Sequence, residues 1–343
     1  MRKLLNTLYV TTADSYLSLD GETIAVLQGD TNLGRIPLHN LEGIVYFGYK
    51  GASPALMAAC AENEIGLCFL SPSGRFLARS SGPTRGNVVL RETQVIWSCD
   101  PFRSAELGRM FLSGKIYNCR WVLERTLRDH SLRVDETRIR NAIDRQKEAL
   151  AALGNDCSAD GLMGVEGSAA KAYFGAFDEM ILRNKADFSF DGRNRRPPLD
   201  PVNAMLSLCY TLLANETASA LETVGLDPCI GFMHQVRPGR KSLALDLLEE
   251  LRAPVADRFV LSLINLGTIT PEDFQTKEDG AVLLKDDARQ KFLAAWQKHK
   301  QETLTHPFLK EKLFWGLVPY VQAMLLARYM RGDLDAYPPF LWK

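Results

Sequence analysis

The sequence lacks three features that would narrow its class at once: net charge, a long apolar run and closely spaced cysteines. Its 343 residues hold 41 Lys and Arg against 41 Asp and Glu, so the total charge gives no argument for a nucleic-acid or acidic-membrane partner, although such partners respond to local charge. The most apolar stretch, residues 313–327, is interrupted by Pro319 and Gln322 and is too short to span a bilayer. The N-terminus has no long apolar segment, which argues against a signal peptide. We therefore expect a cytoplasmic protein with no membrane partner.

The cysteines are dispersed, and no two of them form a Cys-x-x-Cys pair. The seven are Cys60, Cys68, Cys99, Cys119, Cys157, Cys209 and Cys229. An odd, scattered set is typical of reduced core thiols and argues against a disulfide framework or a thiolate zinc site. The sequence also has no P-loop, no GxGxxG motif, no internal repeat and no low-complexity tract. Without a phosphate-cradling glycine loop, a phosphohydrolase acting on small nucleotides is a weak hypothesis.

What the sequence does contain is a change of hydrophobic period near residue 100. Before it, short β-branched and aromatic runs predict strands at 7–12, 15–19, 23–27, 34–38, 43–47, 67–70 and 76–79, with one Ala-rich helix over 53–63. After it, helices are predicted over 104–130, 135–153, 161–181, 200–224, 242–251, 255–266, 286–303 and 307–330. The prediction is an α+β fold with a small N-terminal β-rich domain (1–80), a linker rich in turn formers (81–100) and a larger α-helical domain (101–343).

Of the five histidines, only His234 has a suggestive setting. The other four, His39, His130, His299 and His306, stand among ordinary loop or helix-surface residues and are given no role. His234 leads into the basic residues Arg237, Arg240 and Lys241, and these run directly into an amphipathic helix expected to start with Ser242 as its N-cap.

That helix places Asp246 and Glu249 three residues apart on one face. One imidazole with carboxylate oxygens is a ligand set that suits Mg²⁺ or Mn²⁺ better than zinc, and the basic loop beside it suits phosphate. Such a metal polarises a phosphoryl oxygen and activates an attacking hydroxyl or water. The simpler interpretation is a solvated helix face next to a loop histidine, and spacing alone favours it.

A third carboxylate stands in an unusual setting. Glu166 is flanked by Val165 and Gly167 within a run of small and apolar residues, where a surface glutamate would normally have polar neighbours. Small neighbours allow a ligand or another helix to approach closely. The alternative is an isolated glutamate near a helix N-terminus, which the helix dipole favours.

An arginine-rich loop precedes another predicted helix. Arg193, Arg195 and Arg196 come before two prolines, and the helix then opens with Asp200 as its N-cap. Tyr210 belongs to a polar stripe in that otherwise apolar helix. Arginines in a fixed loop suit a DNA backbone, which they contact without reading sequence; the alternative is a rigid surface loop.

Four segments carry distinctive motifs. The sequence reads Gly-Val-Glu-Gly-x-Ala-Ala-x-x-Tyr-Phe around Glu166, Arg-Arg-Pro-Pro-x-Asp-Pro-x-Asn from Arg195, Gly-Phe-Met-His up to His234 and Ser-Leu-Ala-Leu-Asp-Leu-x-Glu from Ser242. In this order they resemble the CRISPR-associated endonuclease/integrase of spacer acquisition, the Cas1 family. The resemblance extends from the N-terminal β-rich domain to the tail at residues 337–342. The segments Arg-Pro-Gly-Arg-Lys and Leu-Glu-Glu-Leu-Arg-Ala-Pro resemble the subtype I-C branch.

The resemblance implies an N-terminal dimerisation domain and a helical catalytic domain that carries a divalent metal site. It assigns Glu166, His234 and Glu249 as ligands of Mg²⁺ or Mn²⁺, with Asp246 as a further catalytic acid that acts as auxiliary ligand or orienter. Glu249 stands where some members have aspartate, and either can ligate these metals. The implied or expected DNA contacts are Arg85, Arg193, Arg195, Arg196, Tyr210, Arg237, Arg240 and Lys241.

The implied reaction is the insertion of a short foreign DNA fragment into a CRISPR array. A 3′-hydroxyl of the fragment attacks a phosphodiester at the border of a repeat, and with water as nucleophile the same site would be an endonuclease. The implied partners are double-stranded and branched DNA, a second copy of the chain as a homodimer, the small Cas2 protein and, in subtype I-C, the Cas4 nuclease. The alternative is a non-catalytic dimeric scaffold that binds DNA without needing metal.

Local charge fits a DNA-directed protein better than the neutral sum does. Residues 101–130 hold six Arg and Lys against three acids, and residues 234–241 hold three basic residues and no acid. Residues 242–250 then hold three acids and no base. Positive sites for phosphate and negative sites for a metal lie side by side and cancel in the total.

Overall fold

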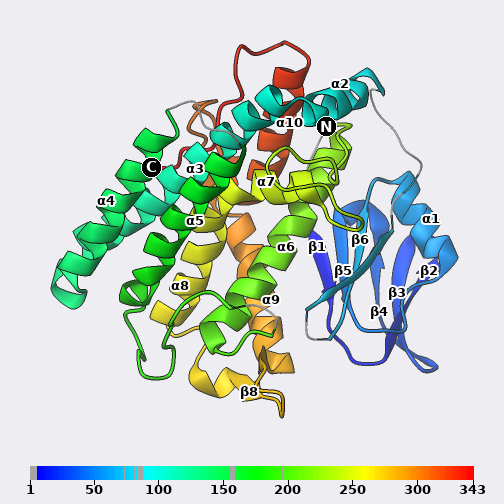
Figure 1. Cartoon of the computed structure of the whole chain (residues 1–343). Coiled ribbons are helices and arrows are strands. Elements are labelled where there is room, and N and C mark those ends of the chain that lie inside the picture. Colours follow the sequence, from blue (N-terminus) through cyan, green and yellow to red (C-terminus); the bar gives the residue numbers. More distant parts are fainter. Residues whose placement is uncertain (1–5, 73, 81, 83–87, 155–158, 195–196) are drawn as a thin grey trace. The chain divides into compact units, whose positions relative to one another are not determined.

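The computed structural model describes residues 6–72, 74–80, 82, 88–154, 159–194 and 197–343, without the side chains of 159 and 160 (Figure 1). The chain divides into two compact units. The first consists of Met1–Arg85 with Leu284–Glu302, and the second of Gly86–Leu283 with Thr303–Lys343. In the described part of the chain, no helix has the length and apolar character that crossing a membrane requires.

Two sheets build the first unit. One has the order β1-β5-β6-β7, with parallel pairs β1–β5 and β5–β6 and an antiparallel pair β6–β7, and the other is the antiparallel β2-β3-β4. The strands are β1 (Thr7–Val10), β2 (Ser15–Asp20), β3 (Thr23–Gln28), β4 (Thr31–Pro37), β5 (Gly43–Phe47), β6 (Gly66–Leu70) and β7 (Phe76–Ser80). Helix α1 (Pro54–Glu62) begins after Ser53, whose Oγ accepts a hydrogen bond from the Leu56 amide at 3.2 Å. The predicted β-rich region is confirmed.

Helices build most of the second unit. They are α2 (Val88–Cys99), α3 (Pro101–His130), α4 (Glu136–Ala152), α5 (Ala159–Gly175), α6 (Pro201–Thr223), α7 (Ser242–Leu251), α8 (Arg258–Asn265) and α10 (Val318–Met330). The 30-residue α3 packs against α4, α5 and α7, and its N-cap is Asp100, whose carboxylate accepts the Phe102 amide at 2.8 Å. A π-helical turn, Arg252–Asp257, joins α7 to α8 at Pro254, which cannot donate the usual helical hydrogen bond. The predicted α+β class is confirmed.

The domain boundaries differ from those predicted. The expected linker, 81–100, contains α2, because Leu90, Gln94 and Trp97 follow a helical period and Leu90 and Gln94 are buried. The segment that holds α9 (Asp286–Lys300) belongs to the first unit rather than to the helical one. Its Lys300 ammonium donates to the Thr7 hydroxyl at 3.0 Å.

Three further expectations for the region after residue 100 were wrong. Residues 307–314 are not helical: β10 (Thr303–Thr305) pairs with β11 (Lys312–Phe314), a 3₁₀ turn covers Trp315–Leu317, and α10 begins at Val318 because Pro319 suits only a first helical turn. A second short sheet, β8 (Phe274–Thr276) with β9 (Val282–Leu284), also lies beyond residue 100. His306 is not a surface residue, since it is fully buried and pairs with Gln322 at 3.0 Å.

The C-terminal tail packs into the helical unit beside α7. Glu250, on α7, accepts hydrogen bonds from the Tyr337 hydroxyl and, at 2.9 Å, from the Phe340 amide. Asn118 donates to the carbonyls of Glu250 and Phe340, each at 2.7 Å. Trp342 lies under the Arg258 guanidinium at 4.1 Å. The tail therefore helps to fix the helix that carries Asp246 and Glu249.

Candidate metal and nucleic-acid site

A buried carboxylate holds His234 in place. Asp246 is completely buried, and its Oδ2 accepts the amides of Phe232 and Met233 at 2.7 and 3.1 Å. Its Oδ1 accepts the His234 amide at 2.9 Å and lies 2.6 Å from His234 Nδ1. With Nδ1 as the donor in this pair, Nε2 keeps its lone pair for a ligand. Asp246 is therefore placed as the orienter of His234 and makes its contacts away from the ligand nitrogen.

The chain reaches Asp246 only because residue 231 is glycine. A Cβ there would lie 2.7 Å from the Ser242 Cβ and 2.8 Å from Asp246 Oδ2. Ser242 is the first residue of α7 rather than its N-cap, which is Lys241, and the Ser242 hydroxyl donates to the Gln235 carbonyl at 3.1 Å. The expected capping role was wrong, and the serine instead ties the loop of His234 to the start of the helix.

Glu249 and Glu166 face a common cation. Glu249 lies one helical turn after Asp246 on α7 and is 4 % exposed, while Glu166 comes from α5. Between them stands Lys115 of α3, whose Nζ hydrogen-bonds to Glu166 Oε1 and lies 2.8 Å from Glu249 Oε2. Arg252 Nη2 is 3.0 Å from Glu249 Oε1, and His234 Nε2 is 3.9 Å from that same oxygen. The three predicted ligands thus come from three segments of the chain, with Lys115 joining Glu166 to Glu249 and Glu249 next to His234.

Neighbouring charges keep Glu249 and Lys115 ionised. Burial by itself would raise the pKa of Glu249, but Arg252 and Lys115 outweigh it and lower that pKa to about 2. Burial would likewise lower the pKa of Lys115, but Glu249 and Glu166 raise it overall. Glu249 is therefore an anion at neutral pH, as a metal ligand must be.

The donor set fits a hard divalent cation. One imidazole nitrogen and two carboxylates suit Mg²⁺ or Mn²⁺, and Lys115 shows that a positive charge is stabilised between the carboxylates. Glu249 Oε2 is buried and, apart from its ion pair with Lys115, accepts no well-aligned hydrogen bond. Within the described ranges, no three His, Cys, Asp or Glu side chains already surround one point at ligand distance. Instead, the Lys115 ammonium contacts both Glu166 and Glu249.

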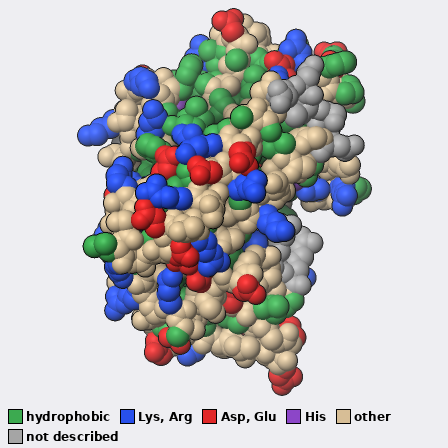
Figure 2. All heavy atoms as spheres, turned by 60° about the vertical axis from the view of Figure 1, so that its left-hand side comes forward, with side chains coloured by type: hydrophobic (Ala, Val, Ile, Leu, Met, Phe, Trp, Pro, Cys, Tyr) green, Lys and Arg blue, Asp and Glu red, His purple; other side chains and the backbone are tan. Residues whose placement is uncertain are grey.

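The three predicted ligands open onto one cleft of about 670 Å³. Lys171, Arg193 and Arg240 line it as well, so cationic side chains surround the carboxylates. On the face drawn in Figure 2, Lys and Arg side chains alternate with Asp and Glu, and no broad area carries one sign.

The structure separates the predicted DNA contacts. Arg85, Arg195 and Arg196 lie outside the described residues. Arg193 and Arg240 line the cleft, whereas Arg237 is exposed and is not among the lining residues. Lys241 donates to the Asn215 side chain at 3.0 Å.

Tyr210 is held inside the unit. Its hydroxyl donates to Asp257 Oδ1 at 2.5 Å, and the guanidinium groups of Arg193 and Arg252 lie 5.2 and 4.9 Å from the centroid of its ring. Tyr210 therefore positions two arginines in this structure.

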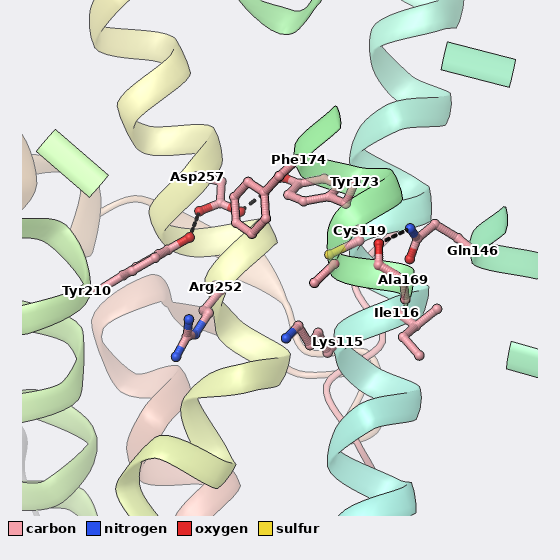
Figure 3. A pocket seen from close by; sticks show the side chains of 11 residues that line it. Lys115, Ile116, Cys119, Gln146, Ala169, Tyr173, Phe174, Tyr210, Arg252 and Asp257 are labelled. Carbon is pink, nitrogen blue, oxygen red and sulfur yellow. Dashed lines mark hydrogen bonds between the residues drawn. The ribbon is translucent and has the colours of Figure 1, made fainter. Parts of the chain in front are cut away.

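A small cavity of about 20 Å³ lies beside the ligands (Figure 3). Asp257 is buried at its edge and accepts the hydroxyls of Tyr173 and Tyr210. Burial raises the pKa of Asp257 to about 6, against the lowering effect of the two tyrosine hydrogen bonds. Gln146 also lines the cavity and donates to the Ala169 carbonyl at 2.8 Å.

Sequence reasoning missed three charged residues of this region: Lys115, Arg252 and Asp257. Each carried a signal. Lys115 follows Phe111 by four residues on an otherwise apolar helix stripe, and Asp257 ends the apolar run Val255-Ala256. Arg252 is three residues beyond Glu249, the spacing of a helical ion pair. A charged residue on a buried stripe needs a partner, and that need could have indicated all three.

The family model and the curated relatives that match this chain name the same protein family. Residues 8–298 match the family model described as CRISPR associated protein Cas1. The chain is 49 % identical over 343 residues to "CRISPR-associated endonuclease Cas1 1" of Chlorobaculum tepidum, covering 100 % of both chains. It is 35 % identical over 342 residues to a "CRISPR-associated exonuclease Cas4/endonuclease Cas1 fusion" of Geobacter sulfurreducens, covering 97 % of this chain and 60 % of the fusion.

Solved structures share the fold. A "Casposase bound to integration product" superposes with a TM-score of 0.84 at 22 % identity and covers 98 % of this chain and 94 % of that one. A "Cas6-RT-Cas1--Cas2 complex" gives a TM-score of 0.82 at 23 % identity and covers 98 % of this chain and 36 % of that one. At these identities the likeness concerns the fold.

Proposed function

The chain belongs to the Cas1 family of CRISPR-associated proteins, whose relatives are named endonucleases, and from this membership we propose that it inserts short foreign DNA fragments into a CRISPR array. The chain is a nuclease of that family, and joining is the same attack on a phosphodiester with a different nucleophile. A 3′-hydroxyl of the fragment replaces water as the nucleophile on a phosphodiester at the repeat border. The products are a new phosphodiester and a released 3′-hydroxyl of the repeat.

One observation carries the active-site assignment. His234, fixed through Nδ1 by buried Asp246, presents Nε2 toward Glu249, and both line the cleft that Glu166 shares. Glu166, His234 and Glu249 would hold Mg²⁺ or Mn²⁺, and such an ion stabilises negative charge on phosphoryl oxygens and activates a hydroxyl.

Other side chains at the site position the metal ligands and bind the DNA backbone. Asp246 keeps His234 in one orientation, and Arg252 keeps Glu249 ionised. Arg193 and Arg240, on the wall of the same cleft, would hold the DNA backbone through charge-assisted hydrogen bonds to phosphate.

The expected protein partners are inferred from a complex and a fusion in which related proteins occur. A neighbour in fold is part of a complex with Cas2, and a relative is fused to Cas4, so we expect this chain to work with a Cas2 protein and a Cas4 nuclease. We also expect it to act in the cytoplasm as a homodimer on double-stranded and branched DNA. Membership of subtype I-C remains a prediction.

The test is a joining assay with labelled fragment and repeat DNA, with and without Mn²⁺ and a Cas2 partner. Glu166→Gln, His234→Ala and Glu249→Gln should each abolish joining and nicking, while Glu148→Gln, a matched change on the exposed face of α4, should keep both. Full activity in all three site variants would refute the assignment. Salt-sensitive DNA binding without any metal-dependent reaction would point to the non-catalytic scaffold instead.

A further inference from the structure

Lys115 is a buried charge in an unusual position. It is 8 % exposed, lies in the middle of α3, and reaches the carboxylates of both Glu166 and Glu249. A buried ammonium is stable only with such partners, and two buried carboxylates close together likewise need a cation between them. In the absence of metal, Lys115 therefore supplies the charge that allows both glutamates to be ionised at one site.

The charges of the cluster favour a cation with more than one positive charge. Asp246, Glu166 and Glu249 contribute three carboxylates, and Lys115 and Arg252 contribute two positive charges within the same set of contacts. With His234 neutral, as a metal ligand must be, the cluster is one positive charge short. A divalent ion in place of the ammonium supplies that missing charge.

The small cavity beside the cleft offers a second position for the Lys115 ammonium. Lys115 lines both the cleft of the carboxylates and the cavity of about 20 Å³ drawn in Figure 3, where its side chain extends from α3 beside Arg252. The cavity has room for about one water-sized group. Gln146 lines it and is fully buried, and its Oε1 has no hydrogen-bond partner among the described residues. That oxygen is an acceptor suited to an ammonium group.

Resting on the metal site proposed above, we propose that Lys115 is a displaceable counter-cation of Glu166 and Glu249: its ammonium holds the two carboxylates together without metal and leaves toward the cavity when a divalent cation binds. Lys115 is then a positioning residue that sets metal affinity. Its charge opposes the entry of the ion, and the ion pairs it gives up must be replaced by ligand bonds.

The test is a titration of the purified full chain with Mn²⁺ alone, in which calorimetry measures the binding affinity. Lys115→Met should bind Mn²⁺ at least about tenfold more tightly than the native chain, because a unit charge about 4 Å away opposes the ion even at an effective dielectric constant of about 20. Lys115→Gln serves if the methionine variant does not fold. Lys171→Met is the matched control: Lys171 lines the same cleft, but no ion pair joins it to the ligands in the described structure, so affinity should change little.

Thermal unfolding in a chelator gives an independent readout. Without Lys115 the paired glutamates repel each other, so Lys115→Met should unfold at a lower temperature than the native chain, and added Mn²⁺ should raise its midpoint by more. A folded Lys115→Met protein with unchanged or weaker Mn²⁺ affinity would overturn the proposal. Failure of the native chain to bind Mn²⁺, or binding untouched by Glu249→Gln, would instead refute the metal site on which it rests.

Discussion

Replacing Asp246 with asparagine tests whether this buried carboxylate acts through His234. The substitution keeps the shape of the side chain but removes its charge and turns one acceptor oxygen into a donor. Oδ1 accepts from the His234 amide and lies against Nδ1, and Oδ2 accepts from the Phe232 and Met233 amides. Whichever oxygen becomes NH₂, two N–H groups lose their acceptor.

The size of the effect follows from those contacts. A hydrogen bond to a charged group contributes about 1.5–3 kcal/mol, so losing two lowers the free energy of unfolding of the helical unit by about 3 kcal/mol or more. Loss of a residue that orients a metal-ligating histidine typically weakens metal binding by about 10–100-fold. Both effects are expected for Asp246→Asn, the second because His234 Nε2 is no longer directed toward Glu249.

The assay is Mn²⁺ titration by calorimetry together with the rate of DNA joining at saturating Mn²⁺. Asp191→Asn is the matched control, because Asp191 is exposed on the wall of the same cleft and is not among the contacts of His234. Circular dichroism checks that the Asp246 variant is folded. A folded variant that binds Mn²⁺ as tightly as the native chain would refute the orienting role.

Three further changes have defined outcomes. Gly231→Ala should weaken Mn²⁺ binding and destabilise the chain by about 1–3 kcal/mol, since its Cβ would lie 2.8 Å from Asp246 Oδ2; native behaviour in calorimetry and thermal unfolding would contradict this. Tyr337→Phe removes a donor from buried Glu250 and should cost about 1–3 kcal/mol in denaturant unfolding, whereas an unchanged midpoint would show that the tail does not brace α7. Burial raises the pKa of Asp257 from 3.8 to about 6, so its neutral form stabilises the fold below about pH 4 and this contribution is lost by about pH 6. Between these values the native chain should lose about 3 kcal/mol relative to Asp257→Asn, and parallel pH profiles of unfolding would refute the burial argument.

Local sequence signals predicted the helices that carry the site. The period of 3.6 residues located α7 within one residue, and the spacing of Asp246 and Glu249 placed both on one face. The N-cap Asp200 was also readable, and its Oδ1 accepts the Asn203 amide at 2.7 Å. Caps and periodicity act within a few residues, which is why one sequence is enough to find them.

The partners of those residues could not be read in the same way. Lys115 meets Glu166 and Glu249 only because α3 packs between α5 and α7, and no local pattern specifies that packing. The excess of basic residues over 101–130 suggested phosphate contacts, yet Lys115 from that excess is buried against carboxylates. Tyr210, expected at DNA, donates its hydroxyl to Asp257, the last residue of the π-helical turn.

The central claim is that Glu166, His234 and Glu249 hold one divalent ion. It is tested most directly by anomalous diffraction at the manganese edge from crystals of the full chain soaked in Mn²⁺. The account predicts one strong peak about 2.0–2.3 Å from His234 Nε2 and from an oxygen of each glutamate, absent in crystals of Glu249→Gln. A peak on other residues, or no peak at these three in a chain that still joins DNA, would contradict it.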